Sequence, residues 1–392
     1  MTNRRGRVLG AATTAFADYP ETGPMELAAR AVSSALADAG LDRNQIDGVI
    51  VHPAVSETAF VDELVWSLGL EVRYATQVWG HGWWVGSLVS EALGALSLGH
   101  ADRIAIVYSS SDSSTNIGFR TGVGLPPRQL IEEGFRDFGG ASGEMNHIGA
   151  ASPVAMAALA AQRYFHLYGC EPDDLAEIAV ASRYNASLNP NAAHRTVITR
   201  DDYLASPWIV EPMRAFDCCR ISDGAACVIL GLDEGDRTVD ILASSGLQLG
   251  ADQYTFGHSG LGGWWEPARD GAVQARADDD LYRRAGVARG DIDGVYTYDA
   301  FTILIPLALE KYGFHEYGEG LRALQSGAMR VGGELPVNTH GGLHSEGHSS
   351  GWGAFAEMVR QLRGEAGDRQ IADAEVLQWA PLFGNSVILG RN

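Results

Sequence analysis

Cysteine is scarce in this chain, and its distribution is uneven. The 392 residues include four cysteines, and none of them stands before Cys170. Cys218 and Cys219 are adjacent, which fits neither a disulfide framework nor a zinc-binding spacing, so we expect reduced thiols and a cytoplasmic protein. A cysteine nucleophile in the first 169 residues is therefore excluded.

Positive charge is also in short supply. Lys and Arg together number 29 against 49 Asp and Glu, which gives a formal net charge of −20. This balance argues against nucleic acid or an anionic membrane surface as the main partner. An anionic ligand would need a local basic patch in this chain, or a partner protein that supplies one.

Long hydrophobic runs are absent as well, so we expect no membrane insertion. Arg4 and Arg5, followed by residues 8–17, resemble a signal peptide only weakly, and we expect that stretch to form the first core strand. Hydrophobic residues make up 46% of the chain and charged residues 20%. Those values are typical of a globular protein with a sizeable core, and the length allows two domains.

What the sequence does have is a concentration of glycine and histidine in one stretch. Residues 332–353 contain seven glycines together with His340, His344 and His348. So much glycine predicts a tightly turning loop in place of a helix interior. The following residues, 354–363, have the apolar spacing of an amphipathic helix, so His348 would lie near a helix N-terminus that favours negative charge. Two alternatives stay open from these residues alone: a metal site of three histidines, or a purely structural loop.

Predicted strands and helices alternate along the chain, which favours an α/β protein with a largely parallel sheet covered on both faces. Residues 110–150 have little regular pattern and are expected to form a loop excursion. The predicted strands lie at 6–14, 47–52, 102–109, 226–230, 238–247, 293–298 and 374–379. The predicted helices lie at 24–40, 61–70, 86–99, 153–168, 172–188, 201–205, 276–286, 303–312 and 354–363.

An internal repeat indicates that the chain is duplicated. Residues 39–49 (AGLDRNQIDGV) and 285–295 (AGVARGDIDGV) are identical at seven of eleven positions without a gap. Both segments lie between a predicted helix and a predicted strand, as expected of duplication. We therefore predict an N-terminal half at 1–235, with a loop region at about 110–215, and a C-terminal half at 236–392. The Gly80-His81 and Gly347-His348 loops would meet at a pseudo-twofold axis and form one site.

The duplicated pattern and its motifs resemble the thiolase superfamily, and most of all its sterol-carrier-protein-x branch with the thiolase-like aldolases of steroid side-chain degradation. The resemblance covers nearly the whole chain. It implies a duplicated βαβαβαββ fold in five layers, α-β-α-β-α, with a loop excursion in the first half. The segments that carry it are DCCRISDGAACVIL (217–230), GADQYT (250–255), YDAFT (298–302), LEKYGF (309–314), GGELPVNTHGG (332–342) and VRQLRG (359–364).

The chain departs from ordinary thiolases at their nucleophile. Thiolases place a cysteine at the start of the third helix of the first half, because their chemistry passes through an acyl-thioester. Counted back from the turn at 99–102, that position falls on Gly82, and the second thiolase cysteine is also missing from residues 377–385. Cysteine-dependent thiolase activity is therefore not expected. The steroid-type aldolases resemble thiolases that have lost this cysteine.

The resemblance to these aldolases also implies site residues. Tyr298 in the YDAFT motif takes the place of a thiolase His or Asn, while His348 keeps the thiolase-like Gly-His where the aldolases have a second tyrosine. Tyr254 matches and is expected near the pocket, and His81 mirrors His348 as a second candidate acid or base. The remaining candidates have supporting roles: loop orientation or water binding by Asn338 and His340, bracing by Asp299, filling of the lost nucleophile site by Trp83 beside Gly82, and loop support by His344. Structural roles remain open for each of these residues, such as a core tyrosine at 298 or a loop histidine at 348.

The implied reaction is retro-aldol cleavage of a β-hydroxyacyl-CoA. A base removes the β-hydroxyl proton, the Cα–Cβ bond breaks, a ketone or aldehyde leaves, and a thioester enolate is protonated. Because tyrosine ordinarily titrates near pH 10, Tyr298 would need help to act as tyrosinate, and protonated His348 is one candidate for that help. His348 is equally a candidate donor to the thioester oxygen.

The family resemblance implies partners as well. We expect a homodimer and a separate small subunit with a zinc ribbon and an OB-fold. Zinc is expected only in that subunit, and this chain is expected to bind no cofactor or metal of its own, while its substrate carries coenzyme A. Two other functions stay open: a non-catalytic subunit that binds acyl-CoA or lipid, and an acyltransferase that lacks the usual cysteine.

Overall fold

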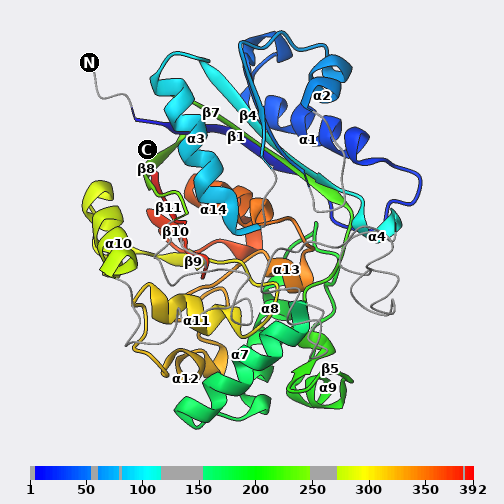
Figure 1. Cartoon of the computed structure of the whole chain (residues 1–392), viewed down its shortest axis with the longest axis vertical. Helices are drawn as coiled ribbons and strands as arrows, with labels where there is room; N and C mark the ends of the chain where they lie inside the picture. Colours follow the sequence, from blue (N-terminus) through cyan, green and yellow to red (C-terminus); the bar gives the residue numbers. More distant parts are fainter. Residues whose placement is uncertain (1–4, 54–60, 79–81, 116–152, 248–271, 383–384) are drawn as a thin grey trace.

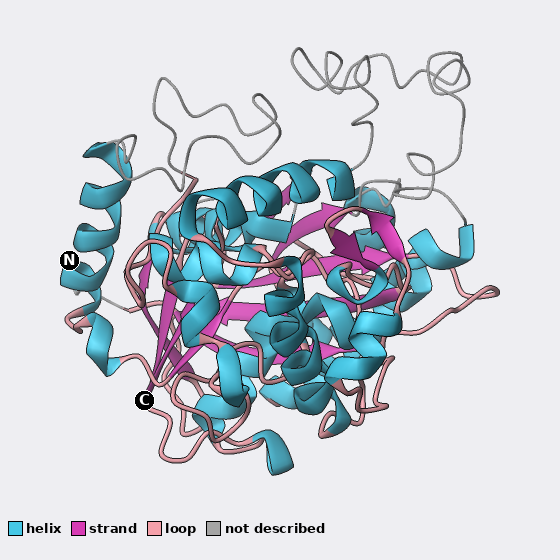
Figure 2. Ribbon diagram, turned by 90° about the horizontal axis from the view of Figure 1, so that it is seen from below, coloured by secondary structure: helices cyan, strands magenta, loops and turns pink. Residues whose placement is uncertain are grey.

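The computed structural model describes residues 5–53, 61–78, 82–115, 153–247, 272–382 and 385–392. Strands form a mixed sheet with helices on both sides (Figures 1 and 2), which confirms the α/β class. The expectation of a largely parallel sheet was wrong, because five strand pairings of this sheet are antiparallel and three are parallel. In this part of the chain no helix is long and apolar enough to cross a membrane.

The first half contributes five strands to a nine-stranded sheet. Their order is β3-β2-β4-β7-β1, with β2 parallel to β3 and β4, and β7 antiparallel to β4 and β1. Buried residues fill β2, β7 and nearly all of β1 and β4, as the continuous apolar runs predicted. The strands span β1 (Arg7–Thr13), β2 (Gly48–Pro53), β3 (Tyr74–Gln77), β4 (Arg103–Ser110) and β7 (Gly224–Gly231).

The second half repeats this order. Its strands run β8-β11-β10-β9, with β9 parallel to β10 and β11 antiparallel to β10 and β8. A parallel bridge between Val295 and Val337 lies where β3 lies in the first half, and short β1–β8 pairing joins the two sets. The strands span β8 (Val239–Ser244), β9 (Gly294–Tyr296), β10 (Val376–Trp379) and β11 (Val387–Arg391).

Helices form the layers around and between these strands. α1 (Pro24–Ala39) packs on β1, β4 and β7, and α2 (Val61–Leu68) packs beside it. α3 (Val85–Ser97) and α14 (Trp352–Arg363) lie in the middle, where α14 contacts strands of both halves. α10 (Ala272–Ala285) and α11 (Leu304–Lys311) lie on the far side from α1 (Figure 1). The five-layer arrangement is thereby confirmed.

The remaining elements are shorter or belong to the loop region of the first half. Figure 1 shows the green helices of this region below the C-terminal strands. These elements are α4 (Asp112–Thr115), α7 (Pro153–Tyr168), α8 (Ala176–Ser187), α9 (Arg200–Ala205), the hairpin β5 (Trp208–Val210) and β6 (Met213–Arg214), α12 (Gly320–Ala323) and α13 (Gly342–Ser345).

The sequence repeat corresponds to one structural device used twice. In each copy a helix ends, a 3-10 turn follows, and a strand begins: β2 in the first half and β9 in the second. Asp47 accepts hydrogen bonds from the backbone amides of Asp102 and Arg103 at the start of β4. Its counterpart Asp293 accepts from the amides of residues 375 and 376 at the start of β10. The equivalent aspartates Asp47 and Asp293 therefore fix the start of the neighbouring parallel strand, β4 in the first half and β10 in the second.

Several boundaries differ from the sequence-based expectations. β3 and the final strand β11 were not predicted, because each has only four or five residues. Residues 172–175 form a 3-10 turn before α8, so the helix predicted at 172–188 is split. α13 is a single helical turn inside the glycine-rich stretch, entered through positive φ at Gly341 and Gly342. The division at residue 235 stays a prediction.

The duplicated cap can be tested by replacing Asp293 with alanine. Removal of a carboxylate that accepts two backbone amides should lower the free energy of unfolding by about 1–3 kcal/mol. Asp368→Ala is the control, since Asp368 is exposed and the described residues form no hydrogen bond with its side chain. Urea unfolding of both variants measures the effect, and equal midpoints would contradict the assigned role.

Candidate active site

The site begins with a missing side chain at Gly82. Gly82 lies in the turn that leads into α3, and a Cβ atom placed there would lie 2.2 Å from Cε2 of Tyr298 and 2.8 Å from Cα of Ser350. The aromatic ring of Tyr298 therefore occupies the space that any side chain at position 82 would need. Gly82 of the first half thus meets Tyr298 and Ser350 of the second half. Gly80 and His81, which were predicted to meet the Gly347-His348 loop, lie outside the described residues.

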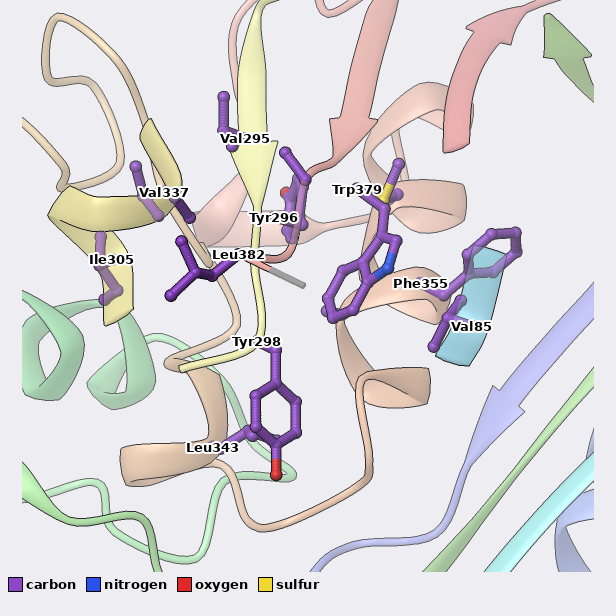
Figure 3. Packing of buried hydrophobic residues seen from close by; sticks show 14 of the residues in the cluster. Val85, Val295, Tyr296, Tyr298, Ile305, Val337, Leu343, Phe355, Trp379 and Leu382 are labelled. Carbon is purple, nitrogen blue, oxygen red and sulfur yellow. The ribbon is translucent and has the colours of Figure 1, made fainter. Parts of the chain in front are cut away.

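Tyr298 and His348 contact each other directly. The Tyr298 hydroxyl lies 3.2 Å from Nε2 of His348, and the two rings meet edge to face with centroids 6.0 Å apart. Tyr298 follows β9, and Figure 3 shows its hydroxyl directed away from the hydrophobic cluster around Trp379. Both side chains are buried, at 5% and 8% exposure. The two residues singled out most strongly from the sequence thus form one pair.

Burial shifts the two pKa values in opposite directions. It raises the pKa of Tyr298 well above its usual 10, with Cys219, Tyr108 and Asp299 adding to the rise. It lowers the pKa of His348 to about 4, although nearby Asp299 acts in the opposite direction. Desolvation disfavours whichever form carries charge, so the tyrosine stays protonated and the histidine stays neutral at pH 7.

These shifts correct one expectation about the pair. A protonated His348 beside a tyrosinate would require two charges in a site that favours neither. The structure instead presents a neutral hydroxyl next to a neutral imidazole, and with the imidazole proton on Nδ1 the hydroxyl donates to Nε2. Such a pair can pass a proton along its own hydrogen bond without first creating an isolated charge.

Asp299 and His344 lie behind the pair and connect three segments. Asp299 accepts the backbone N–H of Leu343 at 2.9 Å, and its other oxygen lies 3.3 Å from Nδ1 of His344. Nε2 of His344 lies 3.1 Å from the carbonyl oxygen of Asp217. Asp299, His344 and Asp217 are all buried. These contacts hold the glycine-rich loop against the segment that follows Tyr298.

Asn338 and His340 lie deeper, at the start of the loop. Asn338 adopts a φ of 46° and makes two hydrogen bonds to the backbone of Thr297, which fixes the end of β9. His340 stacks on Tyr296, and its Nε2 lies 3.8 Å from Glu346. The three histidines of the loop therefore contact different partners: His340 lies near Glu346, His344 near Asp299 and His348 near Tyr298. Within the described ranges no group of three or more His, Cys, Asp or Glu side chains is placed to hold a metal ion.

Three of the candidate residues lie partly or wholly outside the described structure. Tyr254 and His81 fall in the ranges 248–271 and 79–81, which are not described. The backbone of Trp83 belongs to the turn before α3, but its side chain is also outside the described set. Their proximity to the Tyr298–His348 pair stays a prediction.

The structure adds residues that were not singled out from the sequence. Ser222 accepts the backbone N–H of His348 at 2.9 Å, and it belongs to the SDGAA segment that carried the resemblance. His52 is the second-last residue of β2 and accepts the indole N–H of Trp352 at 2.9 Å, while Tyr108 from β4 packs edge-on against the His52 ring. His52 and Tyr108 stand at the carboxyl ends of parallel strands, a place where functional groups of α/β proteins often gather. That signal could have identified them.

The steric exchange at Gly82 predicts a clear effect of one methyl group. Gly82→Ala should lower the free energy of unfolding by about 1–3 kcal/mol, because the buried Tyr298 ring must shift. The control is Gly94→Ala in α3, where a Cβ would meet nothing within 4 Å and should raise stability by about 0.5–1 kcal/mol. Thermal unfolding measures both. Equal stability of the two variants would contradict the close approach.

The lowered pKa of His348 predicts a pH dependence of stability. Between pH 6.5 and 4 the unfolded chain binds a proton at this histidine that the folded chain does not, so stability falls as the pH falls through this window. The decrease in unfolding midpoint from pH 7 to pH 4.5 should be smaller in His348→Gln than in the unchanged protein. An equal decrease in both would show that His348 is already exposed to protonation in the folded state.

Comparisons with known proteins agree with this geometry. Residues 268–379 match the family model for a thiolase C-terminal domain-like region. The chain is 30% identical over 372 residues to the 17-hydroxy-3-oxo-4-pregnene-20-carboxyl-CoA lyase of Mycobacterium tuberculosis, with 93% of each chain covered. It is 30% identical over 361 residues to a steroid side-chain-cleaving aldolase of Thermomonospora curvata, with 91% of this chain and 90% of that protein covered.

A solved structure leads to the same group. The structure named "Ltp2-ChsH2(DUF35) aldolase" superimposes with a TM-score of 0.82 at 26% identity, and the match covers 100% of this chain and 99% of that one. The likeness therefore extends over both halves, including the segments around Gly82, Tyr298 and His348. The chain belongs to the thiolase superfamily, within the group of thiolase-like aldolases, which are carbon–carbon lyases.

Proposed function

We propose that this enzyme catalyses retro-aldol cleavage of a β-hydroxyacyl-CoA, which yields a ketone or aldehyde and a shortened acyl-CoA. The observation that carries the proposal is the buried hydrogen bond between Tyr298 and His348. The Tyr298 ring lies against Gly82, which has no nucleophilic side chain. Relatives named for a CoA lyase and for steroid side-chain cleavage support a steroid side chain as substrate, and we keep an aromatic side chain as the alternative.

In the proposed reaction the pair acts as a proton relay. The substrate β-hydroxyl gives its proton to the Tyr298 oxygen while Tyr298 gives its own proton to Nε2 of His348. The electron pair of the O–H bond forms the new carbonyl, the Cα–Cβ bond breaks, and its electrons form the thioester enolate. The same proton can return to Cα, so no net charge leaves the site. Asp299 favours the transient imidazolium, as its effect on the pKa of His348 indicates.

An acyltransferase mechanism has little support from this site. No side chain fits at position 82 beside Tyr298. Burial raises the pKa of all four cysteines, that of Cys218 to about 12, so each is a thiol and a poor nucleophile at pH 7. A non-catalytic acyl-CoA or lipid-binding subunit remains the second candidate, and the assay described below separates it from an aldolase.

We further propose a cytoplasmic complex with two kinds of protein contact. β3 is an edge strand of the sheet, which supports a homodimer formed along that edge. The Ltp2-ChsH2(DUF35) structure is named for two components, which supports a separate small subunit, with a zinc ribbon and an OB-fold as proposed from the sequence. Coenzyme A would arrive with the substrate, and zinc would belong to that subunit. Four unpaired cysteines fit a reducing compartment.

The catalytic role of Tyr298 can be tested by carbonyl release. Co-expressed with its partner and given a panel of β-hydroxyacyl-CoAs, Tyr298→Phe should release carbonyl product at least about 100-fold more slowly than the unchanged enzyme, since it removes the relay hydroxyl. Tyr296→Phe is the matched control, because the Tyr296 hydroxyl is fully buried and bonds to Thr339 at 2.7 Å.

The outcomes separate the two candidate functions. Product release that is lost in Tyr298→Phe and kept in Tyr296→Phe supports the relay. Release that is unchanged in Tyr298→Phe contradicts it. Tight binding of CoA esters without release from any substrate would favour the binding subunit.

A further inference from the structure

A basic cluster stands out on the surface of this acidic chain. It consists of Arg183 on α8, His194 in the following loop and Arg220 before β7, and we call it the arginine cluster. Asp18 is the one carboxylate paired with it in the described structure, and that pair lies at the exposed end. In a chain with a net charge of −20, two neighbouring arginines of which only Arg220 is paired with a carboxylate form a local excess of positive charge.

Arg183 is the member without an anionic partner. Its guanidinium lies over the ring of Phe216, with Cζ 5.2 Å from the ring centroid, and the side chain is half-buried. Among the described residues no carboxylate or carbonyl oxygen forms an ion pair or hydrogen bond with it. Burial and the neighbouring charge of Arg220 lower the pKa of Arg183. A half-buried cation that faces another cation is electrostatically unfavourable until an anion lies between them.

Arg220 is held in a fixed orientation beside it. One terminal nitrogen lies 3.1 Å from Nε2 of His194, and the other donates to Asp18 at 3.1 Å. Burial, with help from Arg183 and Arg220, lowers the pKa of His194 to about 4, so this histidine stays neutral and accepts the hydrogen bond. The Nε–H of Arg220 is buried and has no partner in the described structure. One donor of this preoriented guanidinium thus remains unused.

Backbone hydrogen bonds join the arginine cluster to the glycine-rich loop that carries His348. The amide of Arg220 donates to the carbonyl of Leu343 at 3.2 Å, and the amide of His194 donates to Ser345 at 2.9 Å. Cys219, next to Arg220, donates to Ala300, two residues after Tyr298. The cluster is therefore joined by backbone hydrogen bonds to the loop that carries His348 and to the segment that follows Tyr298.

We propose that the arginine cluster binds a phosphate group of the coenzyme A portion of the substrate. This rests on the proposed function, which makes the substrate a CoA thioester. Guanidinium groups bind phosphate through paired N–H donors, and no residue in the described part of the chain accepts a hydrogen bond from the Arg183 side chain. The cluster is then the local basic patch that an acidic chain needs for a substrate that carries several negative charges.

The test is Arg183→Gln in the complex with its partner, assayed with an acyl-CoA and with the corresponding acyl-pantetheine, which has no phosphate. We expect KM for the CoA ester to rise about ten-fold, as for loss of one charged hydrogen bond, with kcat and all parameters for the pantetheine ester unchanged. Arg183→Lys should recover part of the loss. Arg30→Gln, which removes the same charge from an exposed pair with Glu26 on α1, is the control.

Binding measurements make the result independent of turnover. Titration calorimetry with 3′,5′-ADP and with inorganic phosphate should show weaker binding of the nucleotide in Arg183→Gln than in Arg30→Gln. If nucleotide binding is weaker in Arg183→Gln and the protein shows no lyase activity, the phosphate site is supported and the proposed reaction is contradicted. An active enzyme whose KM and nucleotide binding are the same in both variants would overturn the site alone. Loss of inorganic phosphate binding with an unchanged KM would overturn its assignment to coenzyme A.

Discussion

The close approach of Tyr298 to Gly82 is the contact on which the rest of the site depends. Position 82 can hold only hydrogen because the tyrosine ring fills the adjacent space. The same ring position brings the hydroxyl to His348. The absence of a side chain at position 82 and the Tyr298–His348 contact therefore depend on the same ring position. A chain that kept a cysteine here would have no room for the tyrosine.

Burial also keeps both Tyr298 and His348 uncharged. It disfavours tyrosinate and imidazolium alike, which raises one pKa and lowers the other. In the proposed relay, a proton enters the Tyr298–His348 hydrogen bond from the substrate, and the negative charge of Asp299 favours the imidazolium that forms. Without substrate, both side chains of the pair therefore stay neutral.

The loop that carries His348 is held by polar contacts and not by apolar packing alone. Asp299 bonds the loop amide of Leu343, and Asn189 contacts both the carbonyl of His340 and the carboxylate of Glu346. These groups are fully buried, so each lost partner would leave an unsatisfied polar atom. Such a network fixes one loop conformation, which accounts for the different surroundings of three histidines that are evenly spaced in sequence.

The sequence by itself determined the fold class, the duplication and most strands and helices, while the family resemblance indicated Tyr298 and His348 as candidate site residues. It did so because buried strands need continuous apolar runs and because the repeat at 39–49 and 285–295 is written in identical residues. Short elements such as β3 and β11 escaped, since their identity comes from neighbouring strands. Only the tertiary structure decided the charge of the pair, because a pKa depends on what surrounds a group, and that surrounding comes from segments far apart in the chain. The same reason kept the arginine cluster hidden, with residues 183, 194 and 220 separated in sequence and joined only by folding.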